Sequence, residues 1–155
     1  MKKLFALAAV LVVPFFTSCG LLPTDPWDPR DPKDTVNTQE RLLAGTQWML
    51  KSIESRGAVI GVSSEQYKRY TMNFNADGSS GGEAACNAYG SDYTESSGKI
   101  RFHGIVVTQA YCGDEDAVIH RHYFDALTHA ERYTVTAGKL EIRASDGTKL
   151  HFVQN

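Results

Sequence analysis

The sequence predicts an α+β domain built on a small curved or barrel-like antiparallel sheet with a single helix. Short segments in which apolar residues alternate recur between residues 46 and 152, a pattern typical of half-buried strands. Turn dipeptides such as Asp77-Gly78 separate these segments, and only residues 115–129 show a helical period. We expect about six to eight short strands, and their edges are hidden best if the sheet closes or curves around the helix.

The first strands are predicted before residue 80. Apolar side chains with a period of two define an inward face that consists of Trp48, Leu50, Tyr70, Met72 and Phe74. Val59 and Ile60 lie between two glycines, which predicts a short second strand or hairpin arm. Residues 79–93 are rich in Gly, Ser and Ala, and we expect one strand with loop character there.

One long strand and the helix are predicted next. Residues 99–107 alternate at first, and their last three residues, 105–107, are expected to form a buried run. The helix is expected from about Glu115 to His129, with Asp114 as its cap and acidic residues in its first turn, where they favour the helix dipole. Its apolar stripe contains Ile119, Tyr123, Leu127 and Ala130, widened by Phe124.

Three further strands follow the helix. Their apolar segments are residues 133–135, 140–142 and 150–152, and glycine turns at positions 137–138 and 146–147 separate them. Short strands joined by such turns predict an antiparallel meander. With this meander, the globular domain is expected to extend over residues 42–155.

Residues 1–18 have the features of a bacterial lipoprotein signal peptide. Lys2 and Lys3 precede an apolar run, residues 4–16, which is too short to span a bilayer in the mature protein. The run leads into Phe-Thr-Ser-Cys-Gly at positions 16–20, which resembles a lipobox. We therefore expect export and lipidation of Cys19; an ordinary secretory signal cleaved at another position is the alternative.

Residues 19–41 are predicted to form a tether. Asp-Pro pairs recur every third residue, at positions 25–26, 28–29 and 31–32. Proline restricts φ and lacks an N–H donor, so neither a helix nor a central strand is favoured. An extended, polyproline-like spacer would hold the globular domain up to roughly 60 Å from a membrane surface.

The number of cysteines agrees with an exported protein. One of the three lies in the lipobox, which leaves Cys86 and Cys112 to form a disulfide. Disulfides persist in exported proteins, and a bond that closes a loop of about 26 residues contributes roughly 3 to 4 kcal/mol. Two buried free thiols are the alternative. Metal binding is disfavoured because neither cysteine has a partner at ligand spacing.

Composition and motifs argue against several functions. The formal net charge is −2 and no basic stripe is present, which disfavours nucleic-acid binding. His120 and His122 are two residues apart on the predicted helix, so they point to different sides and do not share a metal ion. The sequence has neither a Gly-x-Ser-x-Gly motif nor a phosphate-binding loop. We therefore predict no enzymatic activity, no catalytic residues, no metal and no cofactor.

The globular domain resembles a known family. The residues that carry the resemblance stand in the family's order and spacing: Trp48-x-Leu50, the strand 70–74 with Asp77-Gly78, Gly82, Cys86-Asn87-x-Tyr89, Thr108, Cys112, Phe124-x-x-Leu127, Tyr133 and Leu140. Over about Leu42 to Gln154, the chain resembles the META domain, a family that includes heat-shock lipoprotein-like proteins of bacterial envelopes. The Cys-Asn-x-Tyr element, followed by Thr and the second Cys, is the most specific part.

The resemblance implies a small α+β, barrel-like domain, often carried on a lipid anchor. It also implies an association with heat or envelope stress and, in some members, with virulence or drug-resistance phenotypes. The family has no established catalytic residues that could be transferred to this chain. Ala85 stands where the family usually has Gly.

We expect a non-catalytic, lipid-anchored envelope protein that binds or stabilises other envelope components. Gly20 next to Cys19 resembles the outer-membrane sorting signal of enteric bacteria, so the domain is expected in the periplasm or at the cell surface. The expected partners are the membrane, through the lipid, and an envelope protein or small ligand. Asn87, Tyr89 and Tyr111, which lie near the two paired cysteines, form the expected binding face.

Four alternatives remain open. In the first, the tyrosines near the cysteines pack in the core instead of forming a binding face. In the second, the domain is an inhibitor-like module that blocks an extracytoplasmic enzyme, by analogy with other small disulfide-containing β domains. In the third, the domain carries a small molecule inside the barrel. In the fourth, it is a hydrolase with an unrecognised site.

Overall fold

The computed structural model describes residues 42–155, in which nine antiparallel strands form one sheet. The predicted signal peptide (1–18), the lipidated Cys19 and the tether (19–41) lie outside the described residues. The elements are β1 (Thr46–Ser55), β2 (Ala58–Gly61), the 3-10 helix η1 (Tyr67–Arg69), β3 (Thr71–Phe74), β4 (Ser79–Ala84), β5 (Asn87–Ser96), β6 (Lys99–Val107), α1 (Asp114–Thr128), β7 (Ala130–Thr136), β8 (Lys139–Ala144) and β9 (Lys149–Gln154).

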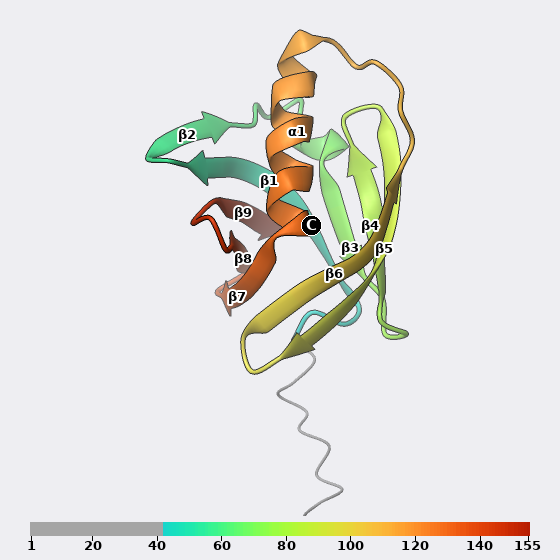
Figure 1. Cartoon of the computed structure of the whole chain (residues 1–155), viewed down its shortest axis with the longest axis vertical. Coiled ribbons are helices and arrows are strands. Elements are labelled where there is room, and N and C mark those ends of the chain that lie inside the picture. The colour runs from blue at the N-terminus through green and yellow to red at the C-terminus, as the bar shows by residue number, and fades with distance from the viewer. Residues whose placement is uncertain (1–41) are drawn as a thin grey trace, which may run out of the picture. The chain divides into compact units, whose positions relative to one another are not determined.

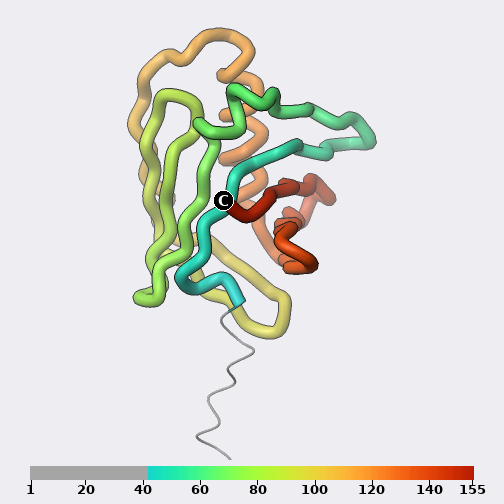
Figure 2. Tube along the Cα trace, turned by 180° about the vertical axis from the view of Figure 1, so that it is seen from behind, coloured from blue at the N-terminus to red at the C-terminus, as the bar shows by residue number. Residues whose placement is uncertain are grey.

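The sheet closes through β1. This strand pairs with β3 and with β9, and the β9 pairing runs from Trp48↔Gln154 to Glu54↔Lys149. Eight strands therefore form a closed ring, and β2 is a ninth strand paired with the end of β1. Figures 1 and 2 show the β1–β2 hairpin extending away from the ring. The predicted α+β, barrel-like fold with a single helix is confirmed, although the expected number of strands was too low.

The ring is least continuous between β6 and β7, and α1 lies beside this seam. In the described part of the chain, β6 and β7 share the single pair Lys99↔Arg132, whereas β5 and β6 pair at seven positions. Figure 1 shows α1 running in front of the strands, from the loop after β6 to the start of β7. The helix contacts β6, β8, β1 and β9. It therefore completes the barrel wall where strand pairing is lost.

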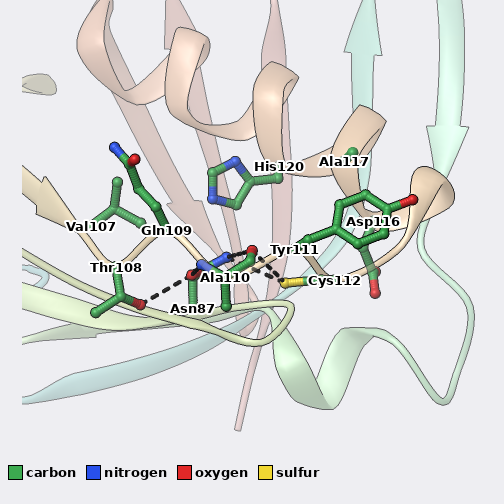
Figure 3. A pocket seen from close by; sticks show the side chains of 10 residues that line it. All are labelled: Asn87, Val107, Thr108, Gln109, Ala110, Tyr111, Cys112, Asp116, Ala117 and His120. Carbon is green, nitrogen blue, oxygen red and sulfur yellow. Dashed lines mark hydrogen bonds between the residues drawn. The ribbon is translucent and has the colours of Figure 1, made fainter.

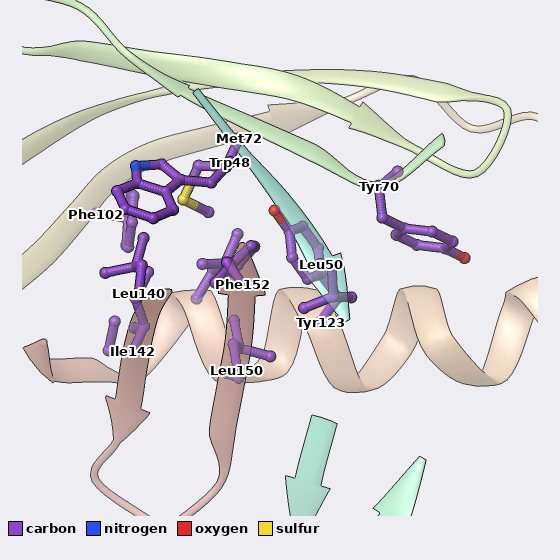
Figure 4. Close-up of a cluster of buried hydrophobic side chains, with 14 of the residues drawn as sticks. Trp48, Leu50, Tyr70, Met72, Phe102, Tyr123, Leu140, Ile142, Leu150 and Phe152 are labelled. Atoms are coloured by element: carbon purple, nitrogen blue, oxygen red, sulfur yellow. The ribbon is translucent and has the colours of Figure 1, made fainter. Parts of the chain in front are cut away.

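The inward side chains of the strands and one side of α1 form an apolar core (Figure 4). The five residues predicted to face inward before residue 80 are at most 2% exposed: Trp48, Leu50, Tyr70, Met72 and Phe74. Ile119, Tyr123 and Leu127 of the predicted helical stripe are buried as well. Because these side chains fill the barrel, the alternative of a carrier that holds its ligand inside the barrel is wrong.

Residues 79–93 belong to two strands, not to the one strand with loop character that we expected. β4 and β5 pair at six positions, and Ala85 and Cys86 form the turn between them. Ala85 adopts a φ of 61°, the left-handed conformation that favours glycine. The alanine at this family position therefore keeps the backbone conformation of a glycine. The extra strand helps explain why the total of nine strands exceeds the expected number.

The end of β6 is not the buried run that we expected. β6 has the predicted bounds, but Val106 is 72% exposed and its two apolar neighbours are only half-buried. Near Gly104, which has a φ of 61°, a bulge shifts the register between β5 and β6. Beyond its pair with Arg132, β6 has no second strand neighbour within residues 42–155. Its last residues are therefore uncovered on one side.

The helix begins and ends one residue earlier than predicted, and its cap is different. The N-cap residue is Gly113, and no side chain caps the helix there. Asp114 is already helical, and its carboxylate accepts a hydrogen bond from the Tyr111 hydroxyl at 2.6 Å. Acidic residues do occupy the first turn, as expected. Within residues 42–155, neither helix is both long enough and apolar enough to cross a membrane.

Candidate binding site beside the disulfide

The candidate site lies where the loop after β6, residues 108–113, passes the turn between β4 and β5. A disulfide joins Cys86 of this turn to Cys112 of the loop, with the two Cα atoms 5.6 Å apart. The predicted pairing is thus confirmed. Because α1 begins two residues after Cys112, the bond fixes the loop and the start of the helix against the sheet.

Asn87, the first residue of β5, holds the same loop through its side chain. Its Nδ2 donates to the carbonyl oxygen of Ala110 at 3.0 Å and to Sγ of Cys112 at 3.2 Å. Its Oδ1 accepts from the N–H of Ala110 at 2.7 Å and from the hydroxyl of Thr108 at 3.1 Å. Asn87 is only 3% exposed, and all of its donor and acceptor positions are used. It is therefore a buried clamp on the loop.

A pocket of about 410 Å³ opens between this loop and α1 (Figure 3). Its apolar wall is formed by Val107, Ala110, Ala117 and the ring of Tyr111. Polar side chains, among them His120, occupy the rest of the lining. Apolar walls with a few placed polar groups are typical of small-molecule binding sites. We refer to this cavity as the loop pocket.

His120 is the pocket residue with unused hydrogen-bonding capacity. Its ring comes from α1 and faces the loop (Figure 3), with its centroid 4.6 Å from that of Phe124. Its Nε2 is buried and has no hydrogen-bond partner within residues 42–155. Burial lowers the pKa of His120 below its ordinary value of 6.5, because desolvation disfavours the imidazolium. The lowered pKa favours the neutral ring at neutral pH, and Nε2 is left without a partner inside the described part of the protein.

Tyr89 lies in the core, which is the alternative to the binding face that the sequence left open for the tyrosines near the cysteines. It is 7% exposed, and its hydroxyl donates to the carbonyl oxygen of Thr71 at 2.9 Å. The Tyr123 hydroxyl donates in turn to Tyr89, at 2.7 Å. Burial raises the pKa of both tyrosines above the ordinary value of 10.0. Tyr89 makes an edge-to-face contact with Phe124 of α1, with the ring centroids 5.3 Å apart. Tyr89 therefore supports the helix that forms one wall of the pocket.

Asp116 fixes the first turn of α1 to the sheet. It is 5% exposed, and its Oδ2 lies 2.8 Å from Nη1 of Arg69. The Tyr70 hydroxyl donates toward Oδ1 and the carbonyl oxygen of Asp116, each at 3.2 Å. A buried carboxylate needs such partners to offset its lost hydration. Together with the disulfide, this contact sets the position of the helical wall relative to the loop.

The structure brings two of the three residues of the expected binding face to the loop pocket. Asn87 and Tyr111 line it, and Tyr89 does not. Asn87 supports the loop with polar atoms that are already bonded, whereas Tyr111 is 78% exposed at the rim. We considered His120 in the sequence only as a metal ligand and did not predict its place at a pocket. The available signal was its place four residues before Phe124 on the apolar side of the helix.

A second pocket, of about 500 Å³, lies on the outer face of β8 and β9. His151, which seemed isolated in the sequence, lies there with its ring nitrogens 3.6 Å from Glu54 and 3.7 Å from Glu141. Lys149 contacts the same Glu54 carboxylate at 3.0 Å. Partly exposed ion pairs of this kind contribute little free energy, and no group of three metal-ligating side chains occurs within residues 42–155. The loop pocket is therefore the better candidate site.

Comparisons with known proteins agree with this architecture. The sequence profile of the META domain family matches residues 41–155. A protein from Burkholderia xenovorans solved by NMR is similar in structure, with a TM-score of 0.65, 23% identity, and coverage of 92% of this chain and 99% of that one. A second NMR structure matches with a TM-score of 0.56 and 19% identity, covering 72% of this chain and 90% of that one.

A third structural relative is a protein of the DUF4847 family from Bacteroides vulgatus. Its TM-score is 0.55 at 13% identity, and the match covers 74% of this chain and 96% of that one. At such low identities these likenesses concern the fold alone. No curated protein matches the sequence significantly.

Proposed function

This chain belongs to the META domain family, and we propose that it acts by binding a small, mainly apolar ligand in the loop pocket. The observation that carries the proposal is the buried Nε2 of His120, which has no hydrogen-bond partner within residues 42–155. An unsatisfied buried polar atom is costly. A ligand that bonds to it, after a rotation of the ring that turns Nε2 to the pocket, would recover that free energy and would be oriented by the bond.

The walls of the pocket support binding because they are held in place before a ligand arrives. The disulfide and the Asn87 side chain fix the loop, and the Asp116–Arg69 ion pair fixes the start of α1. A preformed site loses less conformational entropy when it binds. The apolar groups of Val107 and Ala117 favour an apolar ligand body, and His120 favours one hydroxyl or amide group on it.

A matched pair of probes tests this proposal. We expect 2-naphthol to shift the amide NMR signals of residues 107–120, and 2-methoxynaphthalene, which has no hydroxyl, to bind about fivefold more weakly, as the loss of one hydrogen bond predicts. In the His120→Leu variant the two probes should bind equally. Shifts that are absent, or that map to the outer face of β8 and β9, would contradict the proposal.

We further propose that the domain is a lipid-anchored protein of the bacterial envelope, with a role in heat or envelope stress. The lipobox-like segment at residues 16–20 and the Asp-Pro-rich segment that follows support the anchor, and the family association supports the role. The Cys19→Ala variant should move from the membrane fraction to the soluble fraction of the envelope. A variant that stays membrane-bound would contradict the lipid anchor.

A second candidate function is inhibition of an extracytoplasmic enzyme. The observation that favours it is the β1–β2 hairpin, which extends away from the ring (Figures 1 and 2) and carries Val59 with 68% exposure. A projecting hairpin with an apolar residue near its tip has the shape needed to enter a cleft. Val59→Asp should then abolish co-purification with an enzyme from envelope extracts, whereas His120→Leu should not. The opposite result would favour the loop pocket.

A further inference from the structure

The two cysteines of the Cys86–Cys112 disulfide differ in their exposure to solvent. Cys86 lies on the exposed β4–β5 turn, and Cys112 is half-buried immediately before Gly113, the N-cap of α1. We propose that this disulfide is a site of thiol exchange, at which an external thiolate attacks Sγ of Cys86 and Cys112 leaves as a thiolate. The proposal does not depend on ligand binding in the loop pocket.

Two N–H donors distinguish the sulfur of Cys112. The backbone N–H of Cys86 donates to it at 3.1 Å, and Nδ2 of Asn87 donates to it at 3.2 Å. Sγ of Cys86 lies 3.9 Å from the carbonyl oxygen of Ala110, and a carbonyl oxygen does not stabilise negative charge. Hydrogen bonds to a charged sulfur favour the thiolate and lower the pKa of the thiol. The surroundings thus select Cys112 as the leaving group.

Nearby charges and dipoles act in both directions. The N-terminus of α1, which begins two residues after Cys112, favours a thiolate. The acidic first turn opposes it, but the Asp114 carboxylate is bonded to the Tyr111 hydroxyl and the Asp116 carboxylate to Arg69. The carbonyl oxygen of Ala110, 3.5 Å from Sγ of Cys112, also opposes it. The two direct N–H donors are closer to the sulfur than this carbonyl is.

The step balances without a further reactant. The thiolate sulfur of a small thiol or a protein dithiol forms a bond to Sγ of Cys86, and the bond between the two cysteine sulfurs breaks. The electron pair of that bond stays on Cys112, which becomes the thiolate. The product is a mixed disulfide on Cys86, and the oxidation state of the sulfurs is conserved overall. Attack occurs at the more exposed of the two cysteines, and charge appears at the sulfur with the N–H donors.

The loop need not come apart when the disulfide opens. Asn87 bonds to Thr108 and Ala110 independently of the two sulfurs, so the fold retains a second link at this place. Exchange would therefore convert the native domain into a folded, covalently modified form. An exported protein that forms such adducts is able to bind thiol-bearing partners reversibly.

The test is to identify which cysteine carries the adduct. Full-length Cys19→Ala protein, which keeps both cysteines of the disulfide, is incubated with reduced glutathione under native conditions, treated with N-ethylmaleimide and analysed by peptide mass spectrometry. We expect glutathione on Cys86 and maleimide on Cys112, with roughly a threefold or larger excess over the reverse pattern, because exchange rates follow thiol acidity with a fractional dependence. An equal or reversed distribution, or no adduct on folded protein, would overturn the proposal.

Two single-cysteine variants provide an independent measurement. In the Cys19→Ala background, Cys86→Ser leaves Cys112 as the free thiol, and Cys112→Ser leaves Cys86. The rate of alkylation by iodoacetamide is followed against pH, and circular dichroism checks that each variant is folded. Cys112 should reach half of its maximal rate at a lower pH than Cys86. The reverse order would overturn the assignment of Cys112 as the leaving group, even if adducts form.

Discussion

Asn87 shows how a single side chain organises the candidate site. Its four hydrogen bonds reach three residues of the loop after β6. It follows Cys86 directly, so the covalent link and the amide clamp act on the same loop from adjacent positions. The Cys-Asn pair in the sequence is therefore one structural unit, and each residue strengthens the position of the other.

Replacing Asn87 with alanine should destabilise the domain. The change leaves the backbone N–H and carbonyl of Ala110 without their partner, and we expect the free energy of unfolding to fall by about 1 to 3 kcal/mol. Urea denaturation measures the loss. Gln109→Ala, which removes an exposed amide from the same loop, should change stability by less than about 0.5 kcal/mol. Equal effects of the two variants would show that the clamp is unimportant.

The titration of His120 should make stability depend on pH. Burial lowers the pKa of His120 in the folded state below 6.5, so the unfolded chain binds more protons than the folded one just below that pH. The contribution of this residue is therefore complete above about pH 6.5 and declines as the pH falls. The melting temperature of His120→Gln should fall less than that of the parent protein between pH 7 and pH 5.5.

An NMR titration of the same residue separates this effect from other groups. The imidazole signal of His120 should report a pKa below 6.5 in the folded protein. A ligand whose hydroxyl bonds to Nε2 should lower it further if it binds the neutral ring better than the charged one. A pKa of 6.5 or higher would show that burial does not disfavour the charged form of the ring as the structure indicates.

At the scale of elements, β4 illustrates why small residues are needed in one strand. A Cβ on Gly82 would lie 2.2 Å from the carbonyl oxygen of Thr71 in β3, far inside the contact distance of two atoms. The two strands can approach this closely only because Gly82 has no side chain. The Gly- and Ser-rich stretch, which resembled a loop in the sequence, is therefore a strand under a steric requirement.

Gly82→Ala should separate β3 from β4 locally. The added Cβ would clash with backbone atoms, which cannot move away by a rotamer change as a side chain can. We therefore expect the free energy of unfolding to fall by about 1 to 3 kcal/mol, as for other overpacking changes. Gly61→Ala in β2 is the matched control, because its added Cβ would meet no atom within 4 Å. Chemical denaturation compares the two variants. A Gly82→Ala protein as stable as the control would contradict the close approach.

At the scale of the whole molecule, long-range links close the barrel. β1 pairs with β9 at the other end of the chain, and the disulfide connects positions 26 residues apart. The helix occupies the side where β6 and β7 share the single pair Lys99↔Arg132 within the described residues. The loop pocket lies next to this seam because the chain must leave the sheet there to enter α1.

Removing the disulfide should lower the stability of the whole domain. For a loop of 26 residues, the entropy of loop closure predicts a loss of about 3.5 kcal/mol, which corresponds to a melting temperature lower by roughly 10 °C. The Cys86→Ser/Cys112→Ser protein is compared with Cys19→Ala, which leaves the disulfide intact. An unchanged melting temperature would show that Asn87 alone holds the loop.

Local pattern alone accounts for much of the fold. Alternating apolar residues predicted the inward faces of β1 and β3, with Trp48 and Phe74 among them, and the glycine turns separated the strands after α1. These features depend on the chemistry of neighbouring residues and on fixed periods of two and 3.6. The disulfide was also predicted, because the expected lipidation of Cys19 left two cysteines to pair.

The tertiary structure decided what depends on contacts between distant segments. Local sequence does not reveal that Gly82 meets Thr71, or that Tyr89 hydrogen-bonds to Tyr123 and so lies in the core. Nor does it reveal that β6, in the part of the chain that the structure describes, lacks a second strand neighbour along Ile105–Val107. The same holds for the site, since a loop, a strand and a helix must meet before His120 faces a pocket. Burial and register are properties of the assembled barrel, because closure through β1 and β9 determines which side of each strand is covered.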